Sequence, residues 1–380
     1  MSAFILIPLA VCVYEIASLI LPLRLPLWGR ILAYLILLSG LLKGMLYRRT
    51  PTGFEIIELP YGVSLFFTLV FNFIIIAFFI LLVKDAFFIS WKIFSRVKFP
   101  GYYASLFAFS LALCATLYGT YEGLKLPPVV THEVSIKNLG SEFENFRIAM
   151  LVDIHADELT NHDAVQKIVD RTNSLNPDLI LIPGDFVDGT VKARSHDLEP
   201  LKNLKAKFGV FGVTGNHEYY FDFQGWIKEI PALGVRLLNN EKITLTSGDS
   251  KLIIAGLPDI TGGFMGLTAP DLEATLKDVS EDTPIILMDH QPRNARENAK
   301  YKNIVLQLSG HTHGGQIPIM YQIIKRANNG FVRGWYDVDS ENPAGKMKLF
   351  VSPGTSQWNG FACRIFDPSE ISLFVLHSSI

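Results

Sequence analysis

The chain has 380 residues, 49% of them hydrophobic, and a mean hydropathy of +0.29, which is too apolar for a wholly soluble protein. Nine basic and four acidic residues precede Glu122, whereas the rest of the chain has 25 basic and 32 acidic residues, a net charge of −7. So acidic a region is a poor candidate for binding nucleic acid, and with two of the three cysteines in apolar runs it holds no disulfide framework or cysteine metal site.

The apolar excess lies at the front of the chain and predicts membrane spans. Residues 63–83 contain only three polar residues and are long enough to cross a bilayer core. Three other runs resemble spans, although Lys43 weakens the second: residues 3–23, 30–47 and 102–120. We therefore predict about four transmembrane helices in a membrane domain at residues 1–122, followed by a globular domain at residues 123–380.

Loop charges predict the orientation of these spans. With the N-terminus outside the cytoplasm, six basic residues would lie in cytoplasmic loops and three in the opposite loops. Because basic loops are retained in the cytoplasm, we predict a multi-pass cell-membrane protein whose globular domain lies outside the cytoplasm. The prediction reverses if the weak second span is absent.

Two polar residues, Glu15 and Asn72, stand at membrane depth in the first and third predicted spans. Such groups either form hydrogen bonds between helices or line a polar pathway. We favour hydrogen bonds to polar residues on facing helices.

The globular part begins with alternating strands and helices. Asn161 is typical of a residue that caps a helix, here one with Val165 and Val169 on its apolar face. Strand ends recur about every 31 residues, the size of a β-α-β unit, so their carboxyl ends should meet at one edge of a sheet. The predicted strands are residues 129–137, 146–152, 179–182 and 210–213.

Strands dominate the remainder of the chain. Five further apolar runs suggest a second sheet packed on the first: residues 251–257, 285–288, 304–308, 348–351 and 371–376. The predicted fold class is therefore α/β, a two-sheet α/β sandwich preceded by a helical transmembrane region.

Residue types that bind metals follow these strands. In Gly310-His311-Thr312-His313-Gly314-Gly315-Gln316, two imidazoles leave a strand end and enter a glycine loop. One loop cannot complete a metal coordination shell, so ligands are expected at other strand ends. Singly, such motifs are more often turns or caps, but five in order predict a metal centre. The other strand ends carry Asp153, His155, Asp185, Asp188, Asn216, His217, Glu218 and His290.

The ordered motifs resemble a known family. They match the signature of the calcineurin-like metallophosphoesterase superfamily: Asp153-x-His155, Gly184-Asp185-x-x-Asp188, Gly215-Asn216-His217-Glu218, His290 and Gly310-His311-x-His313. The resemblance covers residues 127–380 and says little about substrate. Gly-Gly-Gln after the last histidine and a closing Arg364, Pro368, Glu370 and Ile371 are similar to its bacterial membrane-anchored branch.

This resemblance implies two divalent metal ions. Asp153, His155, Asp185 and His313 would hold one, and Asp185, Asn216, His290 and His311 the other, with Asp185 bridging. Two such cations polarise a phosphoryl group and lower the pKa of bound water, so metal-bound hydroxide would attack the phosphorus. Ligands that offer only nitrogen and oxygen leave Mn, Fe, Zn and Co open.

The resemblance also implies catalytic roles for His217 and Asp188. His217 is similar to a histidine that contacts the phosphoryl oxygen or protonates the leaving group, and Asp188 to the carboxylate that orients it. A helix-cap role is the alternative for Asp188. Glu218 is expected simply to solvate the start of a helix.

Residues 317–336 mix Ile, Met, Tyr and Trp with Lys325, Arg326 and Arg333. This composition is typical of an amphipathic flap that touches the bilayer or a lipid-linked substrate. An insertion packed into the core is an equally good interpretation.

The sequence thus predicts a membrane-anchored, metal-dependent phosphoric ester hydrolase that acts on a phosphomonoester or phosphodiester. A lipid-linked or cell-envelope substrate is favoured, because tethering raises local concentration at the membrane. One alternative is a nucleotide-sugar pyrophosphatase of lipid A synthesis, which would need a cytoplasmic domain. The other is a membrane scaffold or transporter that keeps the domain for binding, although the intact ligand set argues against it. Monoester or diester specificity, the physiological metal and the oligomeric state stay open.

Overall fold

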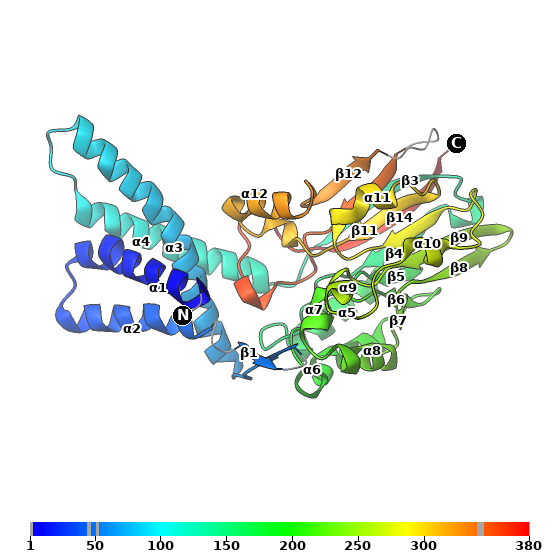
Figure 1. Cartoon of the computed structure of the whole chain (residues 1–380), viewed down its shortest axis with the longest axis horizontal. Helices are drawn as coiled ribbons and strands as arrows, with labels where there is room; N and C mark the ends of the chain where they lie inside the picture. The colour runs from blue at the N-terminus through cyan, green and yellow to red at the C-terminus, as the bar shows by residue number, and fades with distance from the viewer. Residues whose placement is uncertain (1–2, 44–46, 51–52, 340–345, 380) are drawn as a thin grey trace. The chain divides into compact units, whose positions relative to one another are not determined.

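The computed structural model describes residues 3–43, 47–50, 53–339 and 346–379 (Figure 1). Residues 44–46, at the end of the predicted second span, lie outside the described part. Internal contacts divide the chain into two units. The helical unit comprises Met1–Arg48, Ile56–Gly123 and Gly360–Ile365. The second unit, which we call the phosphoesterase unit after the activity expected of it, comprises Arg49–Glu55, Leu124–Asn359 and Phe366–Ile380.

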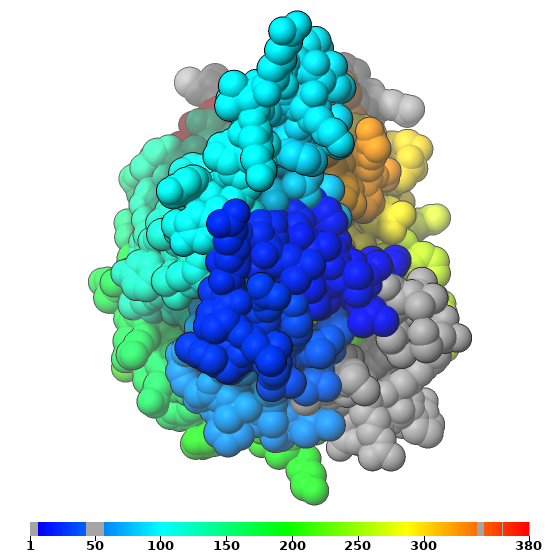
Figure 2. Space-filling view, turned by 90° about the vertical axis from the view of Figure 1, so that its left-hand side faces the viewer, coloured from blue at the N-terminus to red at the C-terminus, as the bar shows by residue number. Residues whose placement is uncertain are grey.

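Among the described residues, four α-helices build most of the helical unit, and their side chains are blue to cyan in the space-filling view (Figure 2). They are α1 (Ala3–Glu15), α2 (Leu27–Lys43), α3 (Tyr61–Phe94) and α4 (Gly101–Leu124). Among the described helices, only α3 and α4 are long and apolar enough to cross a membrane, and two shorter apolar segments run over Ile7–Leu23 and Leu27–Leu42. Four spans, the domain boundary and the orientation therefore stay predictions.

Polar side chains inside the helical unit follow the prediction at one position and depart from it at another. Asn72 donates hydrogen bonds to Thr120 Oγ1 (2.9 Å) and to the carbonyl of Ala362 (2.7 Å), which confirms an interhelical bond. Glu15 is fully buried, and within the described residues its carboxylate has no hydrogen-bond partner, so that prediction is wrong.

The reason lies in helical spacing. Tyr14 and Ser18 are four residues apart and share a helix face, and both hydroxyls donate to Asp85 of α3 at 2.7 and 2.5 Å. Glu15, one residue along from Tyr14, faces in another direction.

A short segment from late in the chain belongs to the helical unit. In Gly360–Ile365, Phe361, Ala362 and Cys363 are buried, and the N–H of Arg364 donates to the carbonyl of Gly119 in α4 (2.9 Å). A Cβ on Gly119 would lie 2.4 Å from Cys363 Sγ, so only glycine allows this close approach.

Two six-stranded sheets form the phosphoesterase unit, as predicted for an α/β sandwich. The first sheet has the order β3 (Val129–Lys137), β14 (Ile371–Ser379), β4 (Phe146–Met150), β5 (Leu179–Ile182), β6 (Val210–Gly212) and β7 (Arg236–Leu237). The second has the order β12 (Gly334–Val338), β13 (Met347–Val351), β11 (Ile304–Ser309), β10 (Ile285–Met288), β9 (Ser250–Gly256) and β8 (Glu241–Ser247). A separate pair joins β1 (Tyr47–Thr50) and β2 (Gly53–Ile56).

The last strand was predicted to join the second sheet, and this is wrong. β14 lies inside the first sheet, parallel to β3 and antiparallel to β4. All residues from Ile371 to Leu376 are buried, so this apolar run suits the interior of either sheet. Its position in the sequence did not distinguish the two.

Alternating side chains on the strands build the core. Ile148 and Leu181 of the first sheet pack with Met288 and Leu308 of the second, between the sheets. Their neighbours point outward, where helices cover them, and each buried Leu or Ile stabilises the fold by about 1.5–3 kcal/mol. The first sheet is covered by α5 (His162–Ser174), α6 (Val191–Leu198) and α8 (Phe223–Ala232), and the second by α10 (Leu272–Leu276) and α11 (Ala295–Asn298).

Candidate metal centre

The predicted ligands lie in loops or at helix starts that follow the carboxyl ends of five strands. β4, β5 and β6 run parallel to one another, as do β10 and β11, so the ends of each set lie at one edge of its sheet. Several of these loop residues have left-handed backbone, which is uncommon without glycine and costs about 1–3 kcal/mol each. The φ angles are 52° at Asp153, 44° at His155, 54° at Asp185, 71° at His311 and 46° at His313.

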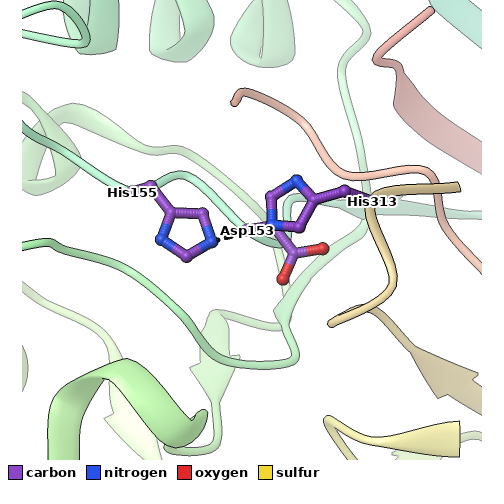
Figure 3. A group of neighbouring side chains, drawn as sticks. All are labelled: Asp153, His155 and His313. Atoms are coloured by element: carbon purple, nitrogen blue, oxygen red, sulfur yellow. Dashed lines mark hydrogen bonds between the residues drawn. The ribbon is translucent and has the colours of Figure 1, made fainter. Parts of the chain in front are cut away.

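The first ligand group consists of Asp153, His155 and His313, whose donor atoms lie within 4.8 Å of one another. Figure 3 shows the two imidazole rings turned toward each other, with the Asp153 carboxylate beside them. The Nε2 atoms of the two rings are 3.0 Å apart. All three residues are buried. The loops after β4 and β11 thus bring together side chains that are 158 residues apart in sequence.

The second group consists of Asp185, His290 and His311, again within 4.8 Å. Asn216 joins it, because its Oδ1 lies 3.2 Å from His290 Nε2 and 2.8 Å from His311 Nδ1. One oxygen, Asp185 Oδ2, lies 3.2 Å from His290 Nε2 and 3.5 Å from His155 Nε2. Asp185 therefore stands between the two groups.

Hydrogen bonds determine which ring nitrogens face the centre. His290 Nδ1 is 2.7 Å from the carbonyl of Pro183, which can only accept, so Nδ1 carries the proton and Nε2 offers a lone pair. His155 Nδ1 likewise lies 2.9 Å from Asp188 Oδ1. Both Nε2 atoms therefore point toward Asp185 as ligands.

The charges of the pocket favour a cation. Burial lowers the pKa of His155, but Asp188 and Asp185 outweigh it and raise that pKa to about 9. Burial also opposes the charged form of His290, yet Asp185 raises its pKa well above the usual value. For Asp185, burial raises the pKa, but the nearby histidines hold it well below the usual range. Asp185 and Asp188 thus stabilise positive charge beside His155 and His290, and a bound cation would take the place of the second proton on Nε2. The carboxylate, amide and imidazole donors of the pocket fit divalent transition-metal ions.

Asp188 links two histidines. Its Oδ1 lies 2.5 Å from His217 Nδ1 as well as 2.9 Å from His155 Nδ1. The alternative cap role is not observed, because the residue before α6 is Thr190. His217 also lies within 4.8 Å of His155 and Asp185, and its side chain is 12% exposed while that of His155 is fully buried.

Glu218 does more than solvate a helix start. It is fully buried, and its carboxylate accepts hydrogen bonds from the backbone N–H groups of Asp185 (3.1 Å), Phe186 (2.8 Å) and Gly215 (2.7 Å). It therefore fastens the loop after β5 to the start of α7 (Asn216–Tyr220). The signal in the sequence was a Glu three residues after a helix cap, as in a capping box.

Glycine allows these loops to approach one another. Gly184 has φ +95°, and a Cβ there would lie 2.6 Å from the nitrogen of Gly215 and 2.8 Å from His290 Nδ1. A Cβ on Gly310 would lie 2.7 Å from Asp153 Oδ2. Sequence reasoning assigned glycines to this role only in the last loop.

Comparison with known proteins agrees with this geometry. A family model described as calcineurin-like phosphoesterase matches residues 146–315, which contain all the predicted ligands. An uncharacterized metallophosphoesterase of Helicobacter pylori is 34% identical over 70% of this chain and 68% of its own length. A transmembrane protein with metallophosphoesterase domain from Danio rerio is 30% identical over 72% of this chain and 62% of its own. The solved NAD nucleotidase of Haemophilus influenzae aligns with a TM-score of 0.39 at 16% identity, over 56% of this chain and 46% of that one.

Proposed function

The chain belongs to the calcineurin-like phosphoesterase family and is a metal-dependent phosphoric ester hydrolase, and from this premise we propose that it hydrolyses a phosphomonoester or phosphodiester presented at a membrane surface. The main support for the proposal is the position of Asp185, because one of its oxygens lies between a histidine of each ligand group. Two ions sharing a carboxylate are the arrangement that clamps a phosphoryl group.

The proposed ligands of the two ions are those that the structure gathers. Asp153, His155, Asp185 and His313 would hold one divalent ion, and Asp185, Asn216, His290 and His311 the other. When bound, two ions of Mn, Fe, Zn or Co would neutralise phosphoryl charge and activate water as the nucleophile. Oxygen and nitrogen donors suit each of these metals.

His217 and Asp188 supply the remaining chemistry in this proposal. Asp188 accepts from His217 Nδ1, which fixes the ring and leaves Nε2 to face the substrate. His217 Nε2 would then donate a hydrogen bond to a phosphoryl oxygen or a proton to the leaving oxygen. The partial exposure of the His217 side chain supports contact with substrate.

The membrane part of the proposal rests on α3 and α4. Both helices are long and apolar enough to span a bilayer, and the Danio rerio relative is called a transmembrane protein. Anchoring would hold the metal centre near lipids and raise the local concentration of a lipid-linked or cell-envelope phosphoester. From the loop charges we place the catalytic domain outside the cytoplasm.

The test is hydrolysis of bis(p-nitrophenyl) phosphate and p-nitrophenyl phosphate by the full chain in detergent, with each metal or with chelator. We expect metal-dependent turnover that falls about 1,000-fold or more in Asp185→Asn, since several kcal/mol of transition-state stabilisation are removed. Asp163→Asn, an exposed carboxylate in the first turn of α5, should retain turnover. A folded protein with no turnover under any metal would instead support a binding role.

A further inference from the structure

Helix α12 (Pro318–Ala327) follows directly on the turn that carries His313. It is labelled in Figure 1 and belongs to the phosphoesterase unit. None of its ten residues is buried. Met320, Tyr321 and Ile324 are half-buried, yet two other large aliphatic side chains of the helix stay exposed, which is unusual because amphipathic helices normally bury their apolar stripe.

The exposed stripe is apolar. Ile319 is 47% exposed and Ile323 is 60% exposed, and their spacing of four residues places them on one face of the helix. Two large aliphatic side chains aligned in this way present a continuous apolar strip rather than scattered surface residues.

The same helix is basic. Lys325 and Arg326 stand exposed in its last turn, and the sequence of α12 contains no acidic residue. Arg326 lies beside the apolar strip, three residues from Ile323, and Lys325 lies on the opposite side of the helix. An apolar strip that ends at a basic residue fits a helix that lies in the interface of an anionic bilayer. Each Lys or Arg near such a surface contributes about 1 kcal/mol of attraction.

The helix is firmly attached to the metal centre. A Cβ on Gly315 would lie 3.2 Å from the Cα of Tyr321, so the backbones of the turn and the helix are in close contact. Left-handed backbone runs through Gly314 (φ 63°), Gly315 (92°) and Gln316 (56°), which fixes the direction in which α12 leaves His313. If α12 docks on a surface, the edge of the metal centre that holds His311 and His313 therefore lies near that surface.

We propose that α12 docks on the surface of an anionic lipid bilayer and so presents the His311–His313 edge of the metal centre to membrane-borne phosphoesters. This rests on the proposed function and names its substrate as one held at a lipid surface. The partner is lipid rather than protein because the same chain carries α3 and α4, which would keep the phosphoesterase unit at a membrane throughout.

A fluorescence experiment tests the docking. The full chain with Cys114→Ser, which removes the exposed cysteine, receives a single Ile323→Cys or Lys325→Cys substitution for an environment-sensitive label. Residues 323 and 325 lie on opposite sides of α12, so the second position is a matched control. Each protein is studied in detergent, in phosphatidylcholine nanodiscs, and in nanodiscs of equal parts phosphatidylcholine and phosphatidylglycerol, with a water-soluble quencher.

We expect quenching at residue 323 to be reduced about fivefold or more relative to residue 325 in the phosphatidylglycerol discs, the change expected for a side chain placed roughly 5–10 Å into the interface. Equal quenching at the two positions would overturn the proposal. Protection that is the same without phosphatidylglycerol would overturn an anionic surface as the partner. Equal protection in detergent and in both kinds of disc would also overturn it, because protein would then cover this face.

Turnover of bis(p-nitrophenyl) phosphate separates the two proposals. We expect Ile319→Ser with Ile323→Ser to keep this turnover in detergent within about twofold, because a soluble substrate needs no docking. Retained turnover with no lipid protection at residue 323 would leave the phosphoesterase standing and overturn the docking helix. If the unsubstituted protein shows no turnover but the label at residue 323 is protected, the proposed phosphoesterase function is overturned and the docking of α12 stands.

Discussion

The metal-site side chains of the phosphoesterase unit project from loops and helix starts at strand ends, several with left-handed backbone, whereas Glu15 and Asn72 of the helical unit project from long helices. Asp185, Asp188 and Glu218 each contact several partners, because the segments that follow β5 and β6 approach one another and, at Asp185, the loop of His290 from the second sheet. In the helical unit, Asn72 finds partners but Glu15, among the described residues, finds none. Helical spacing fixes where a side chain points, which explains why Tyr14 and Ser18 reach Asp85 and Glu15 does not.

The close approach of the metal-site loops can be tested at Gly184. Gly184→Ala combines an unfavourable φ with a Cβ only 2.6 Å from Gly215, so we expect a loss of about 2–5 kcal/mol of stability and loss of turnover. Gly234→Ala is the matched control, because Gly234 also has positive φ (+85°) but nothing within 4 Å of its Cβ. It should lose only about 1–2 kcal/mol. Thermal unfolding in detergent measures both, and equal losses would show that Gly184 is not limited by crowding.

The hydrogen bonds by which one carboxylate joins the loop after β5 to the start of α7 can be weakened at Glu218. Glu218→Gln keeps one acceptor oxygen but cannot satisfy the same three N–H groups, so turnover should fall about 10–100-fold and stability by about 1–3 kcal/mol. Steady-state assays with the soluble diester and thermal unfolding measure these changes. The exposed Glu273→Gln should change neither, and full activity in Glu218→Gln would refute a positioning role.

The helical unit is probed by Asn72→Leu. This change removes the bonds to Thr120 and Ala362, and we expect a loss of about 1 kcal/mol, the usual size for a hydrogen bond between helices in a membrane. Turnover of the soluble diester should stay unchanged, unlike that of Glu218→Gln. Ser90→Ala is the control, because this hydroxyl bonds within α3 to Ala86. A large fall in turnover would show that the Gly360–Ile365 segment acts on the metal centre.

The smallest effect is expected at His377, on the exposed surface of the first sheet. Hydrogen bonds to Glu144 (2.7 Å) and Glu133 (2.6 Å) raise the pKa of His377 in the folded chain. Their stabilisation is therefore complete below the unfolded pKa of about 6.5 and disappears as pH rises through the higher folded pKa. His377→Gln should lower the melting temperature slightly near pH 6 and progressively less toward about pH 9. A difference independent of pH would contradict this account.

The sequence was informative where a local pattern determines a residue's surroundings. Apolar runs followed by Asp, Asn or His placed the ligand residues at strand ends, and β-α-β spacing brought those ends to one edge. The role of Glu218 was not predicted, because two of its hydrogen-bond partners, Asp185 and Phe186, are 33 and 32 residues away in sequence. The sheet to which β14 belongs was not predicted, because an apolar run that is buried on both faces fits either sheet. The lack of a partner for Glu15 was not predicted, because it depends on which face of α1 each neighbouring helix contacts, and hydropathy does not encode this.

The segment Gly360–Ile365 decides how the chain could be dissected. A protease that cut after Gly123 would leave Ala362 hydrogen-bonded to Asn72, so the two fragments would stay together through the late segment. A polypeptide beginning at Leu124 would leave Phe361, Ala362 and Cys363 without the helices that bury them, and it should aggregate unless those residues are replaced. Separating the phosphoesterase unit from the helical unit therefore requires two changes, a cut after Gly123 and replacement of Phe361, Ala362 and Cys363.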